Sequence, residues 1–181
     1  MLSPIKIGIS SCLLGNLVRY DGGHSHDRFL TQTLGMFCEY VPVCPEVECG
    51  MPIPRNSLRL EGDPEAPRLI TRKTREDHTQ QMQSWIDKKL PDLEKENLCG
   101  FIFKSKSPSS GLYRIKVYGD DGTVRNNGVG LFARAFTERF PRIPVEEAGR
   151  LNDPKLRENF IENIFTLQRW RQFLDDRPTL G

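Results

Sequence analysis

Short apolar stretches alternate with amphipathic stretches along most of the chain. Strand-like patterns occupy residues 5–11, 39–44, 99–104 and 113–118, with a shorter one at 143–145. Apolar residues recur at helical spacing in residues 27–38, 77–89, 128–140 and 153–174. Strands that alternate with helices in this way predict an α/β sandwich with a mostly parallel sheet.

Proline and glycine indicate where these elements end. Residues 58–60 and 68–72 are predicted to pair as a small hairpin around the turn GDPEAP. Pro91 is expected to interrupt or restart the helix that begins near residue 77. The many prolines in residues 45–57 predict an ordered loop there rather than a regular element.

Three irregular loops each follow a predicted strand. They cover residues 11–23, 45–57 and 105–111. In an open parallel sheet, the loops at the carboxyl ends of the strands share one edge, and ligands bind there. If the three strands are neighbours, Cys12, Cys44 and Ser110 converge on one site.

Composition and charge narrow the class of protein without identifying a partner. The chain has 181 residues, of which 37% are hydrophobic, and a formal net charge of +2. No apolar run approaches the roughly 20 residues that a membrane span needs, and residues 1–10 lack the pattern of an export signal. We therefore expect a cytoplasmic protein with no membrane partner. Its five cysteines are too few and too scattered for a disulfide scaffold, which leaves buried thiols, metal ligands and catalytic sulfurs.

Three motifs in a fixed order carry a resemblance to a known family. They are SCLLGNLVRYDGG at residues 11–23, VCPEVECGMPIPR at 43–55 and FKSKSPSSGLYRIKVY at 103–118. Together they resemble the thiouracil desulfurase family over residues 5–144. The resemblance implies a Rossmann-like three-layer α/β fold and a four-iron four-sulfur (4Fe-4S) cluster held by three cysteines. It also implies that the free iron takes the sulfur of a thiolated pyrimidine, which water replaces without net redox chemistry.

Two residues match the family's cluster ligands, and the third position departs from the pattern. Cys12 in SCLLG and Cys44 in CPE take the first two positions. The third cysteine of the family lies in an SPSCG motif, whereas this chain reads SPSSG and has Ser110 at that position. A hydroxyl is a harder and more basic ligand than a thiolate, and iron–sulfur clusters are held by soft sulfur. The resemblance therefore predicts that the cluster is absent or labile in this form.

The resemblance also implies a set of catalytic residues. Glu46 matches the catalytic glutamate, placed to move a proton between water and the pyrimidine nitrogen or the leaving sulfide. Ser109 resembles the catalytic serine that orients substrate or water, and Ser107 is the second choice. Asp21 either hydrogen-bonds the base or forms an Asx turn. Polar residues that only cap a turn would give the same sequence pattern for the two serines.

Cys49 leaves more than one interpretation open. It follows Cys44 at a C-x4-C spacing, which also occurs in plant-type ferredoxins, so one interpretation is that Cys49 replaces the missing thiolate. A packed or idle thiol is the interpretation we favour, because the proline-rich loop is not a ferredoxin context. Zinc held by Cys12, Cys44 and Cys49 is a further alternative.

The predicted function is desulfuration of a thiolated uracil, either 4-thiouridine in tRNA or free thiouracil, disabled here by Ser110. The alternative is a non-catalytic nucleobase- or RNA-binding module that has lost the cluster. Basic residues within 55–75 and 104–116 would hold RNA phosphates. We expect residues 1–150 to form the desulfidase domain. Residues 151–181 are expected to form a C-terminal helix, which resembles the start of a second, truncated domain.

Overall fold

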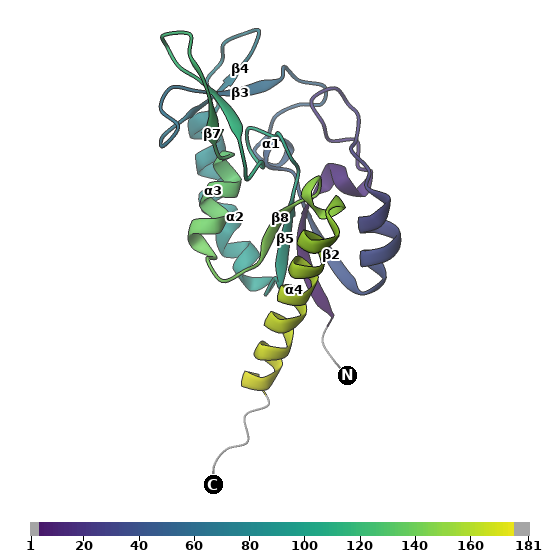
Figure 1. The fold of residues 1–181 in the computed structure, drawn as a ribbon. Coiled ribbons are helices and arrows are strands. Elements are labelled where there is room, and N and C mark those ends of the chain that lie inside the picture. The colour runs from purple at the N-terminus through teal and green to yellow at the C-terminus, as the bar shows by residue number, and fades with distance from the viewer. Residues whose placement is uncertain (1–3, 176–181) are drawn as a thin grey trace.

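A parallel sheet forms the centre of the molecule in the computed structural model, which describes residues 4–175 (Figure 1). In that range its strands are β1 (Ile5–Ser10), β2 (Cys38–Val43), β5 (Gly100–Phe103) and β8 (Val145–Glu147). They are ordered β2-β1-β5-β8, and all the neighbouring pairs are parallel. The strands that precede the three predicted loops, β1, β2 and β5, are therefore neighbours, which meets the condition under which the sequence placed Cys12, Cys44 and Ser110 at one site.

Helices cover both faces of the parallel sheet. One face packs against α2 (Thr79–Lys95) and α3 (Leu131–Arg139). The core on this side contains a cluster of phenylalanine rings: Phe101, Phe103, Phe132 and Phe136. The other face packs against α4 (Pro154–Asp175), the short π-helix η2 (Phe29–Thr33) and the 3-10 helix η3 (Leu34–Met36). This arrangement confirms the Rossmann-like three-layer α/β sandwich.

A second, mixed sheet lies beyond the C-terminal ends of the parallel strands (Figure 1). Its strands among the described residues are β3 (Leu58–Glu61), β4 (Arg68–Thr71), β6 (Ile115–Tyr118) and β7 (Val124–Gly128), in the order β4-β3-β6-β7. The predicted hairpin is confirmed, because β3 and β4 are antiparallel. The second sheet itself was not predicted, since β7 (VRNNG) is polar and exposed over most of its length and has no hydrophobic alternation.

Several predicted helices have different bounds. The helix predicted at residues 27–38 is present in a shorter and irregular form, because the π-helix η2 continues directly into the 3-10 helix η3. Cys38 begins β2 instead of ending a helix. Gly35 and the β-branched threonines within this short segment explain the irregular turns. The third predicted helix begins at Leu131 and not at residue 128. Strand β8 begins two residues later than predicted, after Pro144, which has no N–H to donate.

Two proline-containing segments are more helical than predicted. Helix α2 continues through Pro91 to Lys95, because Leu93 extends the buried face that begins with Met82 and Ile86. The segment that follows β2 contains a single-turn helix, α1 (Pro45–Glu48). Proline is favoured at the first position of a helix, where the missing N–H would have no partner within the helix. The segment predicted as an irregular loop therefore starts with a rigid turn.

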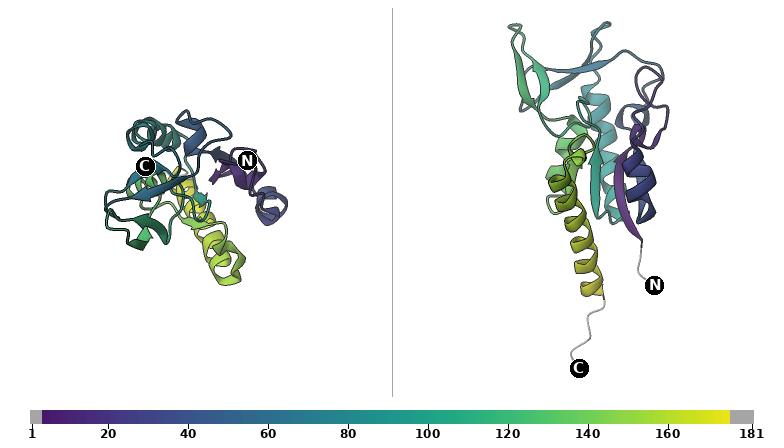
Figure 2. Two further views of the ribbon diagram at one scale, coloured as in Figure 1. Left: turned by 90° about the horizontal axis from the view of Figure 1, so that it is seen from above. Right: turned by 45° about the vertical axis from the view of Figure 1, so that its right-hand side comes forward.

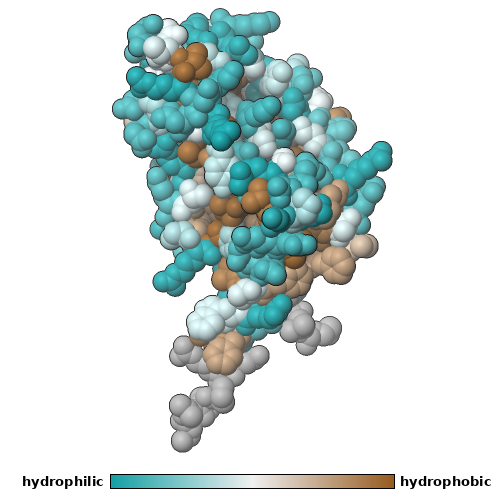
Figure 3. All heavy atoms as spheres, in the orientation of Figure 1, coloured by the Kyte–Doolittle hydropathy of each residue, from teal (hydrophilic) through white to brown (hydrophobic). Residues whose placement is uncertain are grey.

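Helix α4 packs on the parallel sheet through Phe160 and Ile164 and then extends beyond it (Figures 1 and 2). Near its C-terminal end, Trp170 stacks on Phe173, and both are exposed. On the face shown in Figure 3, hydrophobic side chains gather in the lower half of the molecule, whereas the second sheet is mostly hydrophilic. No helix within residues 4–175 is long and apolar enough to cross a membrane. That residues 151–181 begin a second domain stays a prediction.

Gly8 allows the aromatic cluster to lie directly on β1. A Cβ atom at this position would lie 2.2 Å from Cδ2 of Phe101, its partner residue on β5. We expect Gly8→Ala to destabilise the protein by about 1–3 kcal/mol, because the packed ring has to move. Urea unfolding measures this, and Phe101→Leu should cost less in the Gly8→Ala background than in the parent. Simple additivity of the two free-energy changes would contradict the close packing.

Candidate active site

A cavity of about 410 Å³ lies at the C-terminal edge of the parallel sheet. The loops that follow β1, β2 and β5 all contribute to its wall, and residues 57, 58 and 72 of the second sheet and its flanks close another side. The sequence predicted that Cys12, Cys44 and Ser110 would converge, and all three line this cavity. The three candidate residues therefore come from three loops but line one cavity.

The two cysteines are held in short helical turns at the ends of their strands. Cys12 lies in a 3-10 turn, η1 (Ser11–Leu14), and burial raises the pKa of its thiol against the opposing effect of Lys104. Cys44 precedes α1, and its backbone N–H donates to Glu48 Oε1 at 2.9 Å. Burial, followed by the charge of Glu46, raises the pKa of Cys44 to about 11. Without a metal, both sulfurs are therefore neutral thiols near pH 7.

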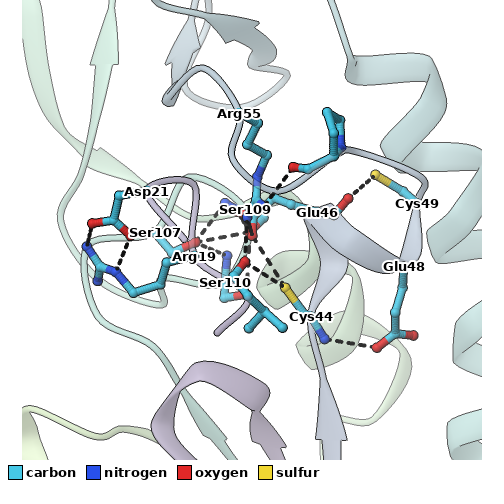
Figure 4. Close-up of polar contacts among 12 residues, drawn as sticks. Arg19, Asp21, Cys44, Glu46, Glu48, Cys49, Arg55, Ser107, Ser109 and Ser110 are labelled. Atoms are coloured by element: carbon cyan, nitrogen blue, oxygen red, sulfur yellow. Dashed lines mark hydrogen bonds and ion pairs between the residues drawn. The ribbon is translucent and has the colours of Figure 1, made fainter. Parts of the chain in front are cut away.

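A serine and a carboxylate form the shortest polar contact at the cavity. The hydroxyl of Ser109, which is fully buried, donates to Glu46 Oε1 at 2.6 Å (Figure 4). The Ser107 hydroxyl lies 3.0 Å from that of Ser109 and completes a hydrogen-bonded row that ends on the carboxylate. The structure thus brings Glu46, Ser107 and Ser109 together from two different loops. Glu46 and Ser107 line the cavity, whereas Ser109 lies behind them and does not.

The loop at residues 105–111, which we call the serine loop, is packed tightly against the start of α3. A Cβ atom at Gly130 would lie 2.5 Å from the backbone carbon of Ser109, so only glycine allows this approach. The carbonyl oxygen of Ser109 accepts hydrogen bonds from the N–H groups of Phe132 and Ala133, at 2.9 and 3.2 Å. The loop therefore caps the helix, and Ser110 is held at only 3% exposure.

Arg55 completes the polar core of the site and was missed as a site residue by sequence reasoning. Its guanidinium lies 3.2 Å from Glu46 Oε2 and donates to the carbonyl oxygen of Val18 at 3.0 Å. The sequence grouped Arg55 with basic residues that would hold RNA phosphates. Its place at the end of the motif VCPEVECGMPIPR was the available signal, because that motif also contains Cys44 and Glu46.

Asp21 is not among the residues that line the cavity. Its carboxylate accepts a hydrogen bond from the N–H of Gly23 at 3.0 Å and lies 3.4 Å from Arg19. The Gly23 N–H and then Arg19 hold the pKa of Asp21 below its usual value. Of the two alternatives left open by the sequence, the structure has the Asx turn, and Asp21 meets the cavity only through Arg19, which lines it.

The residues present do not complete the donor set of a cluster held by three cysteines. Cys12 and Cys44 supply two thiols, whereas Ser110 supplies a hydroxyl. Cys49 does not line the cavity, and its thiol donates to the backbone oxygen of Glu46 at 3.2 Å (Figure 4). In residues 4–175, no three His, Cys, Asp or Glu side chains are placed to hold a metal. This geometry speaks against Cys49 as a replacement ligand and against zinc on Cys12, Cys44 and Cys49.

Fold and site together define an α/β protein with a thiol-, hydroxyl- and carboxylate-lined cavity at the ligand-binding edge of its parallel sheet. A family model described as 2-thiouracil desulfurase matches residues 7–148, and the chain belongs to this family. The chain is also similar to a solved structure described as a [4Fe-4S]-dependent thiouracil desulfidase, TudS, with a TM-score of 0.65 and 27% identity. That similarity covers 86% of this chain and 98% of the other. A search of curated proteins found no match. The resemblance seen in the sequence is thereby confirmed.

The raised pKa of Cys44 predicts an unusual pH dependence of alkylation in the metal-free protein. Only the thiolate reacts, so a pKa of about 11 should make the rate rise up to that pH. Well below pH 9, the thiolate fraction should be about 100-fold smaller than that of an ordinary cysteine. Iodoacetamide labelling followed by peptide mass spectrometry measures the midpoint, with the urea-unfolded chain as the control. A folded-state midpoint below 9 would contradict the burial of this thiol.

Proposed function

We propose that this chain is a desulfidase for thiolated uracil, acting on 4-thiouridine in tRNA or on free thiouracil, and that Ser110 disables the present form. In the reaction, the oxygen of water replaces sulfur at the ring carbon, and the sulfur leaves as hydrogen sulfide without net oxidation or reduction. The contact between Ser109 and Glu46 beside the two cavity thiols is the observation that carries this proposal. Membership of the 2-thiouracil desulfurase family supports it.

Glu46 and Ser109 are the proposed proton-handling pair. A carboxylate that accepts the Ser109 hydroxyl at 2.6 Å is fixed in orientation, with its charge directed at the cavity. In this position Glu46 would take a proton from water and return one to the pyrimidine nitrogen or to the leaving sulfide. Ser109, which is fully buried and does not line the cavity, would hold Glu46 in orientation. Ser107, which lines the cavity and contacts the Ser109 hydroxyl, would orient the substrate or the water.

Cys12 and Cys44 are the proposed protein ligands of the iron–sulfur cluster that the similar TudS structure depends on. The third ligand position is that of Ser110, whose hydroxyl matches iron–sulfur chemistry poorly. We therefore expect the serine form to be colourless or to lose iron readily. The non-catalytic binding module remains the second candidate, because the cavity is fully built in the presence of Ser110.

Ser110→Cys should restore a complete set of thiolates. The change replaces one atom and keeps the shape, so the fold should survive it. After anaerobic reconstitution, we expect about four irons per chain, brown colour and sulfide release from thiouracil or 4-thiouridine. A colourless Ser110→Cys protein that releases no sulfide would favour the binding module.

Two further variants separate the roles in the Ser110→Cys background. Glu46→Ala should keep the iron but reduce turnover by roughly 100-fold or more, because the proton-handling group is lost. Cys49→Ala is the matched control and should leave iron content and turnover unchanged, since its thiol does not line the cavity. If Cys49→Ala removes the iron, Cys49 and not residue 110 is the third ligand.

Positive charge at the cavity supports tRNA as the form of the substrate. Arg72, Lys104 and Lys106 line it, and none of them forms a salt bridge with a carboxylate in the part of the chain that the structure describes. Arg59, which the sequence placed in the same basic group, is paired with the buried Glu61 instead. Five free cysteines suit the reducing cytoplasm where tRNA is found.

Charge reversal at the cavity should weaken tRNA binding. Arg72→Glu and Lys106→Glu should each raise the Kd of the serine form and reduce the salt dependence of log Kd by about 0.9 per lost phosphate contact. Filter binding or fluorescence anisotropy over a salt series measures both. Lys88→Glu, at an exposed position on α2, is the control. Equal weakening by the control variant would count against a specific RNA path at the cavity.

A further inference from the structure

We propose that Arg55 is a positioning residue for desulfuration. It holds the Glu46 carboxylate at one fixed angle and ties the segment that follows Cys12 to it. This role rests on the function proposed above for Glu46, and it assigns Arg55 to the site rather than to a surface that binds phosphates.

The two oxygens of Glu46 have different partners. Oε1 accepts the Ser109 hydroxyl at 2.6 Å, and Oε2 lies 3.2 Å from Nη2 of Arg55 (Figure 4). Rotation of the carboxylate would break both contacts at once. Arg55 and Ser109 therefore fix the plane of the carboxylate from two sides, because only in this plane are both partners satisfied.

The pair is largely withdrawn from water. The side chain of Arg55 is 6% exposed and that of Glu46 is 15% exposed. Every other arginine that forms a salt bridge among the described residues is at least 23% exposed, and Arg134 has that lowest value. Loss of one member of a buried pair leaves an uncompensated charge, so Glu46 depends on Arg55 far more than a surface carboxylate depends on its partner.

Arg55 also holds the wall of the cavity. Its backbone N–H donates to the carbonyl oxygen of Tyr20 at 2.8 Å, and its guanidinium donates to the carbonyl oxygen of Val18 at 3.0 Å. A further donation reaches Pro52 in its own loop at 3.3 Å. Val18 and Tyr20 line the cavity, so one side chain connects the Cys12 loop with the Glu46 turn.

Only a planar fork of donors makes these contacts together. A lysine ammonium keeps the charge but concentrates its donors on one nitrogen. It cannot reach the Glu46 carboxylate and the carbonyl oxygens of Val18 and Pro52 with the same geometry. Arg55→Lys is therefore the informative variant, because it separates charge from position. Arg55→Met removes both.

The catalytic test uses the reconstituted Ser110→Cys protein. Arg55→Lys should keep the urea midpoint close to that of the parent while kcat falls by about 10- to 100-fold with a smaller change in KM. Arg55→Met should lower both kcat and the midpoint, and adding Glu46→Gln should recover much of the midpoint, since no lone charge remains. Full kcat in Arg55→Lys, or in Arg55→Met, would overturn the proposal.

A matched control addresses general damage to the fold. Glu61 is a buried carboxylate held by two arginines, Arg59 and Arg75, and neither of them lines the cavity. The double variant Arg59→Met/Arg75→Met therefore also leaves a buried carboxylate without its arginines. It should lower the midpoint and leave kcat within about twofold of the parent. An equal loss of kcat in this double variant would mean that the effect of Arg55→Met is one of stability, and the proposal would fail.

A second readout needs neither cluster nor activity. In the serine form, Arg55→Lys should increase hydrogen exchange in residues 18–23 and around Glu46, because the ties to Val18 are lost. Unchanged exchange would overturn the positioning role by itself. If exchange rises as expected but the Ser110→Cys parent releases no sulfide, the proposed function fails, and with it the catalytic consequence of Arg55.

Discussion

The pairing of β1 between β2 and β5 is the constraint on which the candidate site depends. Each of these parallel strands ends in a loop that lines the cavity, and only their adjacency brings Cys12, Cys44 and the serine loop together there. A hydrogen bond from the N–H of Lys104 to the Ser10 hydroxyl at 2.9 Å ties the ends of β5 and β1 together. Because core side chains pack on both faces of the sheet, a one-residue slip would exchange the side chains of the two faces and disrupt both cores, so the register is strongly specified.

The sequence predicted the parallel sheet and the edge where its loops meet, because apolar strands and turn residues alternate clearly there. It could not predict the second sheet, since β7 has the polar sequence VRNNG and pairs through its backbone. The pairing of Arg55 was also missed, because the sequence shows that Arg55 shares a motif with Glu46 but not that the two side chains form a buried ion pair. Asp21 shows the same limit, since one pattern fits both an Asx turn and a ligand contact.

The conformation of the site does not depend on the side-chain atom of residue 110 that would bind a metal. The loop is held by backbone contacts, such as Ser110 N–H to the Ser107 hydroxyl at 3.1 Å and Gly111 N–H to the Ser107 carbonyl oxygen at 2.8 Å. None of these contacts needs a sulfur atom at position 110. The cavity, its cations and the contact between Ser109 and Glu46 are therefore built without a complete set of metal donors, which makes this chain suited to asking what the scaffold contributes alone.

The serine loop and α3 share hydrogen bonds, because the carbonyl oxygen of Ser109 caps the first turn of that helix. Neither can open without the other, so they behave as one cooperative unit in local unfolding. Mutational tolerance follows from this coupling. Substitutions that loosen the aromatic packing of α3 should also reduce activity, because they loosen the serine loop, although the substituted residues do not line the cavity. Laboratory evolution of a new substrate preference would therefore meet less resistance in the loops after β1 and β2 than in the serine loop.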